Sequence, residues 1–180
     1  MKLCGAFIGI TDPRRVQGRR ITLSQLLSIS VLSILSGHPG YRGMERFGRA
    51  HREALTLELG LKHGPVGRMT YRDVLKEMDD AQLVSCFNRW ALSFAPEGKW
   101  ISGDGKALAS TVSDPNGKGQ DFEAVVSLFA QESGPTVALA NYRNKDKEVG
   151  EGDLVRTLCG LLKGMGAVIC LDALHTQKKH

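Results

Sequence analysis

Long apolar runs are missing from this chain of 180 residues. No segment reaches the roughly 18 consecutive apolar residues of a membrane-spanning helix, so we expect no membrane span. The N-terminal stretch MKLCGAFIGITDPRR has a short apolar patch but no small-residue cleavage site, and we expect a tail or strand there, not a signal peptide. Apolar residues make up 42% and charged residues 24%, which is typical of a soluble globular protein with one ordinary domain or two small ones.

Cysteine pairs and a nucleotide-binding motif are missing as well. None of the four cysteines belongs to a Cys-x-x-Cys pair or lies near a spaced histidine pair, which argues against a zinc site. Reduced thiols in apolar segments fit a reducing cytoplasm, where we expect this protein. The glycines of GDGKA lack the Gly-x-x-x-x-Gly-Lys-Ser/Thr spacing of a phosphate-binding P-loop. The cysteines are Cys4, Cys86, Cys159 and Cys170.

Lysine is absent between Asp12 and Leu61, where every cationic residue other than histidine is arginine. Residues 1–93 hold 14 lysines and arginines against 8 acids, and residues 94–180 hold 10 against 11, so the net charge of +5 belongs to the first half. The planar guanidinium suits phosphate, which favours nucleic acid as a partner. A solvated basic face is the alternative. The arginines are Arg14, Arg15, Arg19, Arg20, Arg42, Arg46, Arg49 and Arg52.

Helical periodicity dominates the first half. Thr22, with Gln25 three residues later, forms a capping-box pattern before an apolar stripe, and the serines of this segment lie mostly off the stripe. Gly37 predicts the end of that helix. A second helix is expected from Tyr41 to about Glu58.

Further short helices are expected up to residue 95, one of them capped by Thr70. On the second predicted helix, the spacing of Arg42, Arg46 and Arg49 puts all three on one face. Short helices joined by tight turns form either a helix-turn-helix DNA reader or a plain helical bundle, and the pattern alone does not separate the two.

Helical periodicity stops at APEGKW, and we place a domain boundary between residues 95 and 96. Strand patterns follow in WISGD, in a hairpin-like pair at 122–130 and 135–143, and in AVICL after an amphipathic helix. A strand that follows a crossover helix should lie parallel to an earlier one. The predicted fold class is α+β: an all-helical region over 1–95, then an α/β domain with a mixed sheet over 96–180.

Two carboxylates, Asp104 and Asp172, each follow a short apolar run at the expected end of a strand. If the strands are neighbours, their backbones lie about 4.8 Å apart. Carboxylates about 4 Å apart repel by roughly 4 kcal/mol at an effective dielectric of about 20, so either one is protonated or a divalent cation lies between them. Oxygen ligands without a Cys/His set favour Mg²⁺ or Mn²⁺. The alternative is that one aspartate caps a helix and the other lies in a turn.

Several segments carry a family resemblance. In order, DPRRVQGRRITLSQLLSISVLSILSG, GYRGMERFGRAH, GDGKAL and ICLDALHTQ resemble the H-repeat-associated transposases, DDE-type enzymes of bacterial insertion sequences. The resemblance runs from about Asp12 to His180. It implies a helical N-terminal region before a partial ribonuclease-H-like catalytic domain, whose mixed sheet is incomplete. It also implies a bacterial cytoplasm as the location and DNA at the insertion-sequence ends as the partner.

The resemblance implies that Asp104 and Asp172 are the first two metal-binding acids of two-metal phosphoryl transfer, with Asp104 bridging both ions. The family's third acid, a glutamate on a later helix, has no counterpart, and Ala109 replaces an expected basic residue. We therefore expect a truncated, catalytically impaired transposase, able to associate with itself or with a full-length transposase. The alternative is a non-catalytic DNA-binding or interaction module that interferes with an intact transposase.

Two residues beside the aspartates complete the expected site. Lys106, two residues after Asp104, either reaches phosphate or is solvated, and His175, three residues after Asp172, is a candidate for lining the site. The residues expected to bind DNA are Arg14, Arg15, Arg19, Arg20, Arg42, Arg46, Arg49 and Lys106.

Overall fold

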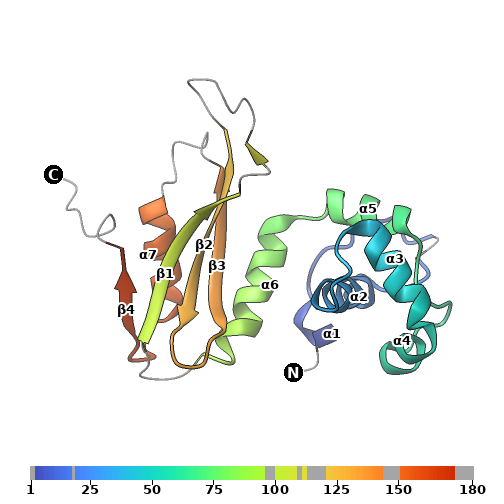
Figure 1. Cartoon of the computed structure of the whole chain (residues 1–180), viewed down its shortest axis with the longest axis horizontal. Coiled ribbons are helices and arrows are strands. Elements are labelled where there is room, and N and C mark those ends of the chain that lie inside the picture. The colour runs from blue at the N-terminus through green and yellow to red at the C-terminus, as the bar shows by residue number, and fades with distance from the viewer. Residues whose placement is uncertain are drawn as a thin grey trace. The chain divides into compact units, whose positions relative to one another are not determined.

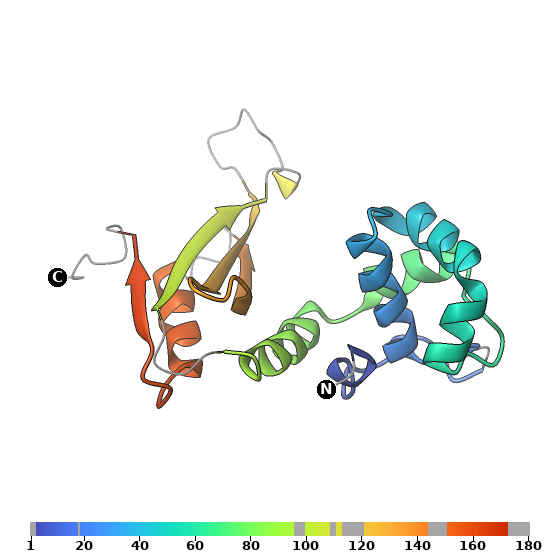
Figure 2. The same ribbon diagram turned by 60° about the horizontal axis from the view of Figure 1, so that its bottom comes forward.

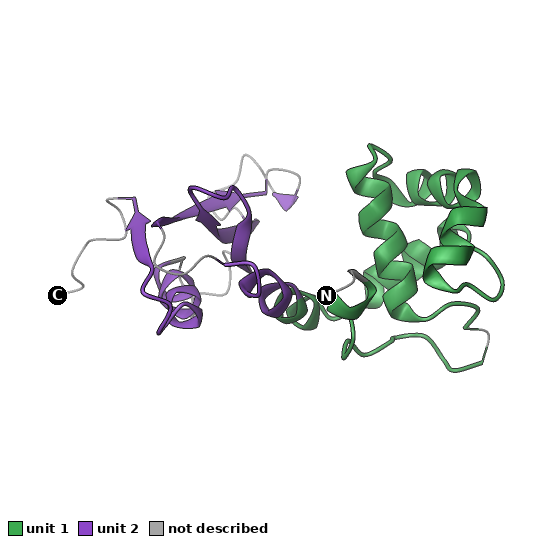
Figure 3. Ribbon diagram, turned by 90° about the horizontal axis from the view of Figure 1, so that it is seen from below, with its two compact units in different colours: residues 1–86 green, residues 87–180 purple. Residues whose placement is uncertain are grey.

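The structure, a computed structural model, describes residues 3–17, 19–95, 100–108, 111–112, 121–143 and 151–172. Expectations for Ala109 and His175 therefore lie outside the described residues. The chain divides into two compact units, unit 1 (Met1–Cys86) and unit 2 (Phe87–His180), which Figure 3 colours separately. None of the described helices is long and apolar enough to cross a membrane.

Unit 1 is helical in its described residues. α2 packs against α1 and α3, and α3 packs against α5. Their apolar sides enclose one core, at whose centre Leu26, Ile29 and Tyr71 are fully buried. The helices, shown in Figures 1 and 2, are α1 (Leu3–Ala6), α2 (Leu23–Leu35), α3 (Gly40–Ala50), α4 (Arg52–Leu59), α5 (Arg68–Glu77) and α6 (Asp80–Leu92), whose second half belongs to unit 2.

The start of α2 confirms the predicted capping box. The Thr22 hydroxyl accepts a hydrogen bond from the Gln25 backbone N–H, and the Gln25 side-chain oxygen accepts one from the Thr22 N–H at 2.8 Å. After α2, Gly37 takes a φ of 78°, as predicted for the helix end. The following turn is tight, because a Cβ on Gly43 would lie 2.5 Å from the backbone oxygen of His38.

Three local predictions in unit 1 are wrong. The helix expected from Tyr41 to about Glu58 is interrupted at His51, which separates α3 from α4. This break allows Leu55 of α4 to enter the same core as Phe47 of α3. The residue before α5 is Gly67, in an extended conformation, so Thr70 lies inside the helix instead of capping it.

The third error concerns the serines of α2. Ser28 and Ser33, expected mostly off the apolar stripe, are fully buried. Their burial is possible because each hydroxyl donates to a backbone carbonyl, that of Ser24 at 2.8 Å and that of His38 at 2.7 Å. Because these small polar side chains can be buried, the rest of unit 1 packs around more of the surface of α2 than its apolar stripe alone would allow.

Unit 2 is built on a four-stranded sheet in the order β3-β2-β1-β4. β1 and β2 are antiparallel, as are β2 and β3, whereas β4 follows α7 and lies parallel to β1, as predicted. The helical unit and this mixed sheet confirm the α+β class. The elements of unit 2 are β1 (Trp100–Ala107), β2 (Glu123–Ala130), β3 (Thr136–Arg143), α7 (Glu151–Leu161) and β4 (Val168–Leu171), together with the end of α6.

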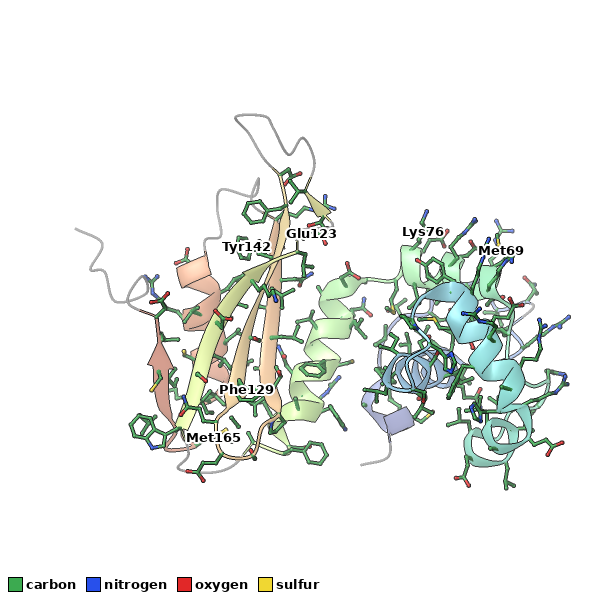
Figure 4. The ribbon with its side chains drawn as sticks, viewed as in Figure 1. Met69, Lys76, Glu123, Phe129, Tyr142 and Met165 are labelled. Carbon is green, nitrogen blue, oxygen red and sulfur yellow. The ribbon has the colours of Figure 1, made fainter. Side chains whose placement is uncertain are left out.

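The two faces of the sheet differ. One face carries fully buried residues such as Ile101 of β1 and Val126 of β2, which form a core with Leu158 of α7. Because side chains alternate along a strand, Asp104 of β1 and its cross-strand partner Ser127 of β2 lie on the opposite face. Phe129 of β2, labelled in Figure 4, occupies one of these alternate positions, because it is paired with Ser102 of β1.

Asn88 covers the outer edge of β3. Its side-chain amide donates to the Leu139 carbonyl and its side-chain oxygen accepts from the Leu139 N–H, both at 2.8 Å, in place of a further strand. Leu92 and Ala95 also pack against the core of unit 2. These contacts explain why the two compact units divide inside α6, between Cys86 and Phe87.

Candidate functional site

The candidate acidic site lies where the ladder between β1 and β4 ends. The last pair of the parallel register is Gly103 with Leu171, and the next residues along the two strands are Asp104 and Asp172. Continued for one residue, the alternation of side chains puts both carboxylates on the sheet face opposite α7. Both aspartates are exposed.

The position of Asp104 within its strand differs from the prediction. The sequence placed this aspartate at the end of a strand, but β1 continues to Ala107, because β2 pairs with it from Ile101 to Ala107. β4 is shorter and stops at Leu171. On the β2 side, Asp104 is therefore within the paired part of the sheet. On the β4 side, the strand pairing ends one residue earlier, at Gly103 and Leu171.

Gly103 permits the close approach of β4. A Cβ on Gly103 would lie 2.6 Å from the Leu171 Cδ2 atom, closer than van der Waals contact allows, and 3.1 Å from the Leu128 Cδ2 atom, which is a tight contact. The Leu171 side chain thus occupies the space that any larger residue at position 103 would need. The glycine before Asp104 therefore lets the Leu171 side chain pack directly against β1 in the register that aligns the two aspartates.

The donors at this site fit one hydrated hard cation. Mg²⁺ is usually held by one or two carboxylates and keeps several waters, which two exposed aspartates on neighbouring strands can satisfy. Across the described residues, no group of three or more His, Cys, Asp and Glu side chains could hold a metal. Lys106 lies two residues further along β1, exposed and on the same face as Asp104, where it can meet an anion.

The candidate basic site lies in unit 1, and α3 forms one part of it. Met44 and Phe47 are buried, whereas Arg42, Arg46 and Arg49 are exposed, as the predicted arginine face requires. Arg49 pairs with Glu45 one turn earlier at 3.4 Å. Arg42 and Arg46 form no ion pair within the described part of the chain.

Asp12 engages two of the arginines predicted to bind DNA. The guanidinium of Arg14 donates to both carboxylate oxygens of Asp12 at 2.9 and 2.8 Å, and also to the Ile21 carbonyl. Arg19 lies 3.5 Å from the same carboxylate and donates to the Arg14 carbonyl. Burial alone would raise the pKa of Asp12, but the hydrogen bonds and charges of the two arginines outweigh it, so this pKa lies below its usual 3.8. Arg14 and Arg19 thus order the loop before α2.

Several cations of unit 1 line cavities that share residues. One cavity contains Arg15, Arg19 and Arg20, and a second contains Arg19, Arg20 and Lys62. A third joins Arg20 to Arg52 and Lys62, and a fourth joins Arg52 to Arg49 at the end of α3. Neighbouring cavities share lining residues, and the four cavities together are here called the basic groove.

Three members of the basic groove, Arg52, Lys62 and His63, were not among the residues expected to bind DNA. Arg52 is at the start of α4, and the other two follow its C-terminal Gly60, so a spacing argument on one helix could not join them. The sequence does contain a signal for the turn that carries Lys62 and His63, namely the flanking glycines Gly60 and Gly64. In the structure these glycines have positive φ values of 64° and 75°.

Comparison with known proteins agrees with a transposase-related chain. Residues 4–91 match the family described as DDE_Tnp_1-associated. The matched part covers unit 1 and most of α6, so the helical unit is similar to the region associated with DDE-type transposases. The match supports a DDE-type transposase-associated family.

A curated relative extends the similarity into the sheet unit. The protein described as "Uncharacterized protein in dhlA 3'region" of Xanthobacter autotrophicus is 28% identical over 170 residues, which are 94% of this chain. The chain spans 57% of the length of that relative.

Proposed function

We propose that this chain has a transposase-type role, in which unit 1 binds DNA through its arginines and the aspartates of unit 2 hold a divalent cation for cleavage of a phosphodiester bond. The observation that carries the proposal is the parallel register of β1 and β4, which makes Asp104 and Asp172 the next pair after Gly103 and Leu171. The family match over residues 4–91 supports a transposase-type role independently, because the matched residues lie wholly outside that sheet.

The cation proposed for this site is Mg²⁺ or Mn²⁺, which when bound would lower the barrier to attack on a phosphodiester. Asp104 and Asp172 supply negative oxygen donors, and Lys106 supplies a positive charge on the same face for a phosphate oxygen. With two carboxylates grouped among the described residues, we expect weak cation binding and slow cleavage. The ribonuclease-H-like assignment of unit 2 belongs to this proposal and is supported by the strand order and the parallel β4.

Nicking of supercoiled DNA in Mg²⁺ tests the catalytic part of the proposal. The wild-type chain should nick slowly, and both Asp104→Asn and Asp172→Asn should abolish the reaction. Asp153→Asn is the matched control, since this carboxylate lies on α7 and pairs at the surface with Arg156. Nicking that persists in both site variants would refute a catalytic role for the aspartates.

The second candidate function is a non-catalytic DNA-binding module that interferes with an intact transposase. It is favoured by the observation that the described residues offer no third metal-binding side chain beside the two aspartates. Under this alternative, the wild-type chain binds DNA but does not cleave it, and Asp104→Asn binds DNA as the wild type does. The same nicking and binding assays therefore separate the two functions.

A second copy of this chain is the proposed protein partner. Within the described residues β4 pairs with β1 alone, and Val168 of β4 is 45% exposed. An open apolar edge strand is a template for pairing with another strand. We expect concentration-dependent self-association in analytical ultracentrifugation, weakened by Val168→Lys but not by Leu57→Lys on the surface of α4. A monomer at every concentration would contradict this proposal.

A further inference from the structure

In one cavity of the basic groove, every charged side chain among the described lining residues is basic. Its volume is about 650 Å³, and its polar lining comes from Arg20, Arg52, Thr56, Lys62 and His63. No described aspartate or glutamate lines it. It differs in this respect from the neighbouring parts of the groove, where Asp12, Asp73 and Glu45 contribute to the walls.

Three of the cations around this cavity have no ion-pair partner in the part of the chain that the structure describes. Arg14 and Arg19 are paired with Asp12, but Arg20, Arg52 and Lys62 form no ion pair with any described residue. Bringing unpaired cations together costs free energy, because like charges repel, and an anion placed between them removes that cost. The arrangement therefore favours a negatively charged ligand.

The backbone around the cavity holds its cations in place. Leu61 is 4% exposed and anchors the loop after α4, so that the next two residues, Lys62 and His63, are exposed. Gly64 has a φ of 75°, and a Cβ on it would lie 3.2 to 3.3 Å from three guanidinium atoms of Arg52. Gly64 thus both permits the left-handed turn and leaves room for the planar group of Arg52 against the backbone.

We propose that this cavity is a phosphate-binding site for one backbone phosphate of DNA, gripped by Arg52, Lys62 and Arg20. The inference rests on the DNA binding proposed above, and it assigns to that binding a discrete subsite outside the arginines of α3. A guanidinium can donate two parallel hydrogen bonds to phosphate, and the lysine ammonium adds a point charge. Since a water occupies roughly 30 Å³ of liquid, the cavity has room for a phosphate with part of its hydration.

DNA binding as a function of salt tests the site in the full chain. Each phosphate contact contributes about 0.9 to the slope of log K against log salt. Lys62→Gln and Arg52→Gln should each lower affinity several-fold for every DNA sequence and reduce the slope by about 1. Lys76→Gln is the matched control, because this lysine projects from α5 into solvent (Figure 4) and lines no part of the basic groove. Circular dichroism melting confirms that each variant is folded.

Titration with inorganic phosphate distinguishes a DNA phosphate from a free anion. Phosphate, compared with chloride at equal ionic strength, should shift the backbone amide signals of Lys62, His63 and Gly64 in NMR spectra. Lys62→Gln should remove these shifts. Gly64→Ala provides a second variant that keeps every charge, and it should weaken phosphate binding because its methyl group displaces Arg52.

The outcomes separate this inference from the proposed function. If wild type binds DNA and the Arg52 and Lys62 variants behave like Lys76→Gln, the phosphate site is overturned and DNA binding stands. If wild type fails to bind DNA but shows the phosphate shifts, and the variants lose them, the site stands as one for free phosphate and the DNA-binding proposal fails. The absence of both DNA binding and phosphate shifts overturns both.

Discussion

Leu171 of β4 lies against Gly103 of β1, with its Cδ2 atom in the space that a Cβ on the glycine would need. This contact is on the α7 side of the sheet, and the residue after each partner is an aspartate on the opposite side. The apolar packing of one face therefore sets the relative position of the two carboxylates on the other.

Gly103→Ala should disturb this alignment. The added methyl group overlaps the Leu171 and Leu128 side chains, and overpacking of this kind typically costs about 1 to 3 kcal/mol. We expect a lower urea midpoint and weaker Mn²⁺ binding than in wild type. Gly160→Ala in α7 is the control, because a Cβ there meets nothing within 4 Å. If Gly103→Ala matched Gly160→Ala in both measurements, the role assigned to Gly103 would be wrong.

The Asn88 side chain should be essential to the edge of β3. Asn88→Ala removes two hydrogen bonds to Leu139, and each contributes about 0.5 to 1.5 kcal/mol. Asn88→Asp should be worse, because a carboxylate oxygen would then face the Leu139 carbonyl instead of an N–H donor. Hydrogen exchange at the Leu139 amide measures the effect directly. Ser85→Ala, at an exposed position of α6, should leave that exchange unchanged.

The ion pairs of Asp12 should make the stability of unit 1 depend on pH. The pKa of Asp12 is lowered in the folded protein, so its stabilising contribution is present above the usual value of 3.8 and is lost as the pH falls through the lower folded value. Asp12→Asn should cost about 1.5 to 3 kcal/mol at neutral pH, the range for a hydrogen bond to a charged group. Denaturation at a series of pH values should show wild type and variant converging in acid. A constant difference down to pH values well below 3.8 would contradict this explanation.

Local signals in the sequence predicted a large part of the fold. Thr22 and Gln25 are three residues apart, so their mutual hydrogen bonds depend on a single helical turn. The parallel placement of β4 follows from the handedness and length of its crossover, and it was predicted from the strand and helix pattern alone. Both features depend on residues close in sequence or on a general rule of connection.

Features that depend on contacts between residues far apart in the sequence could not be predicted from local patterns. The break at His51 reflects how Leu55 reaches the core, and the burial of Ser28 depends on helices that pack around α2. Arg14 is an exception, because it was expected only to bind DNA although its ion-pair partner, Asp12, is just two residues away. The pairing of Gly103 with Leu171 is a matter of register, and no local pattern specifies which residues of two separate strands are opposed.

Paramagnetic broadening of backbone amide NMR signals by Mn²⁺ tests the central relationship most directly. In the wild-type chain, we expect substoichiometric Mn²⁺ to broaden the amides of Asp104 and Asp172 together, and excess Mg²⁺ to reverse the effect. Asp104→Asn and Asp172→Asn should each remove the broadening at both positions, because one cation is shared. Broadening at only one of the two aspartates, or broadening that survives both substitutions, would contradict a common cation site.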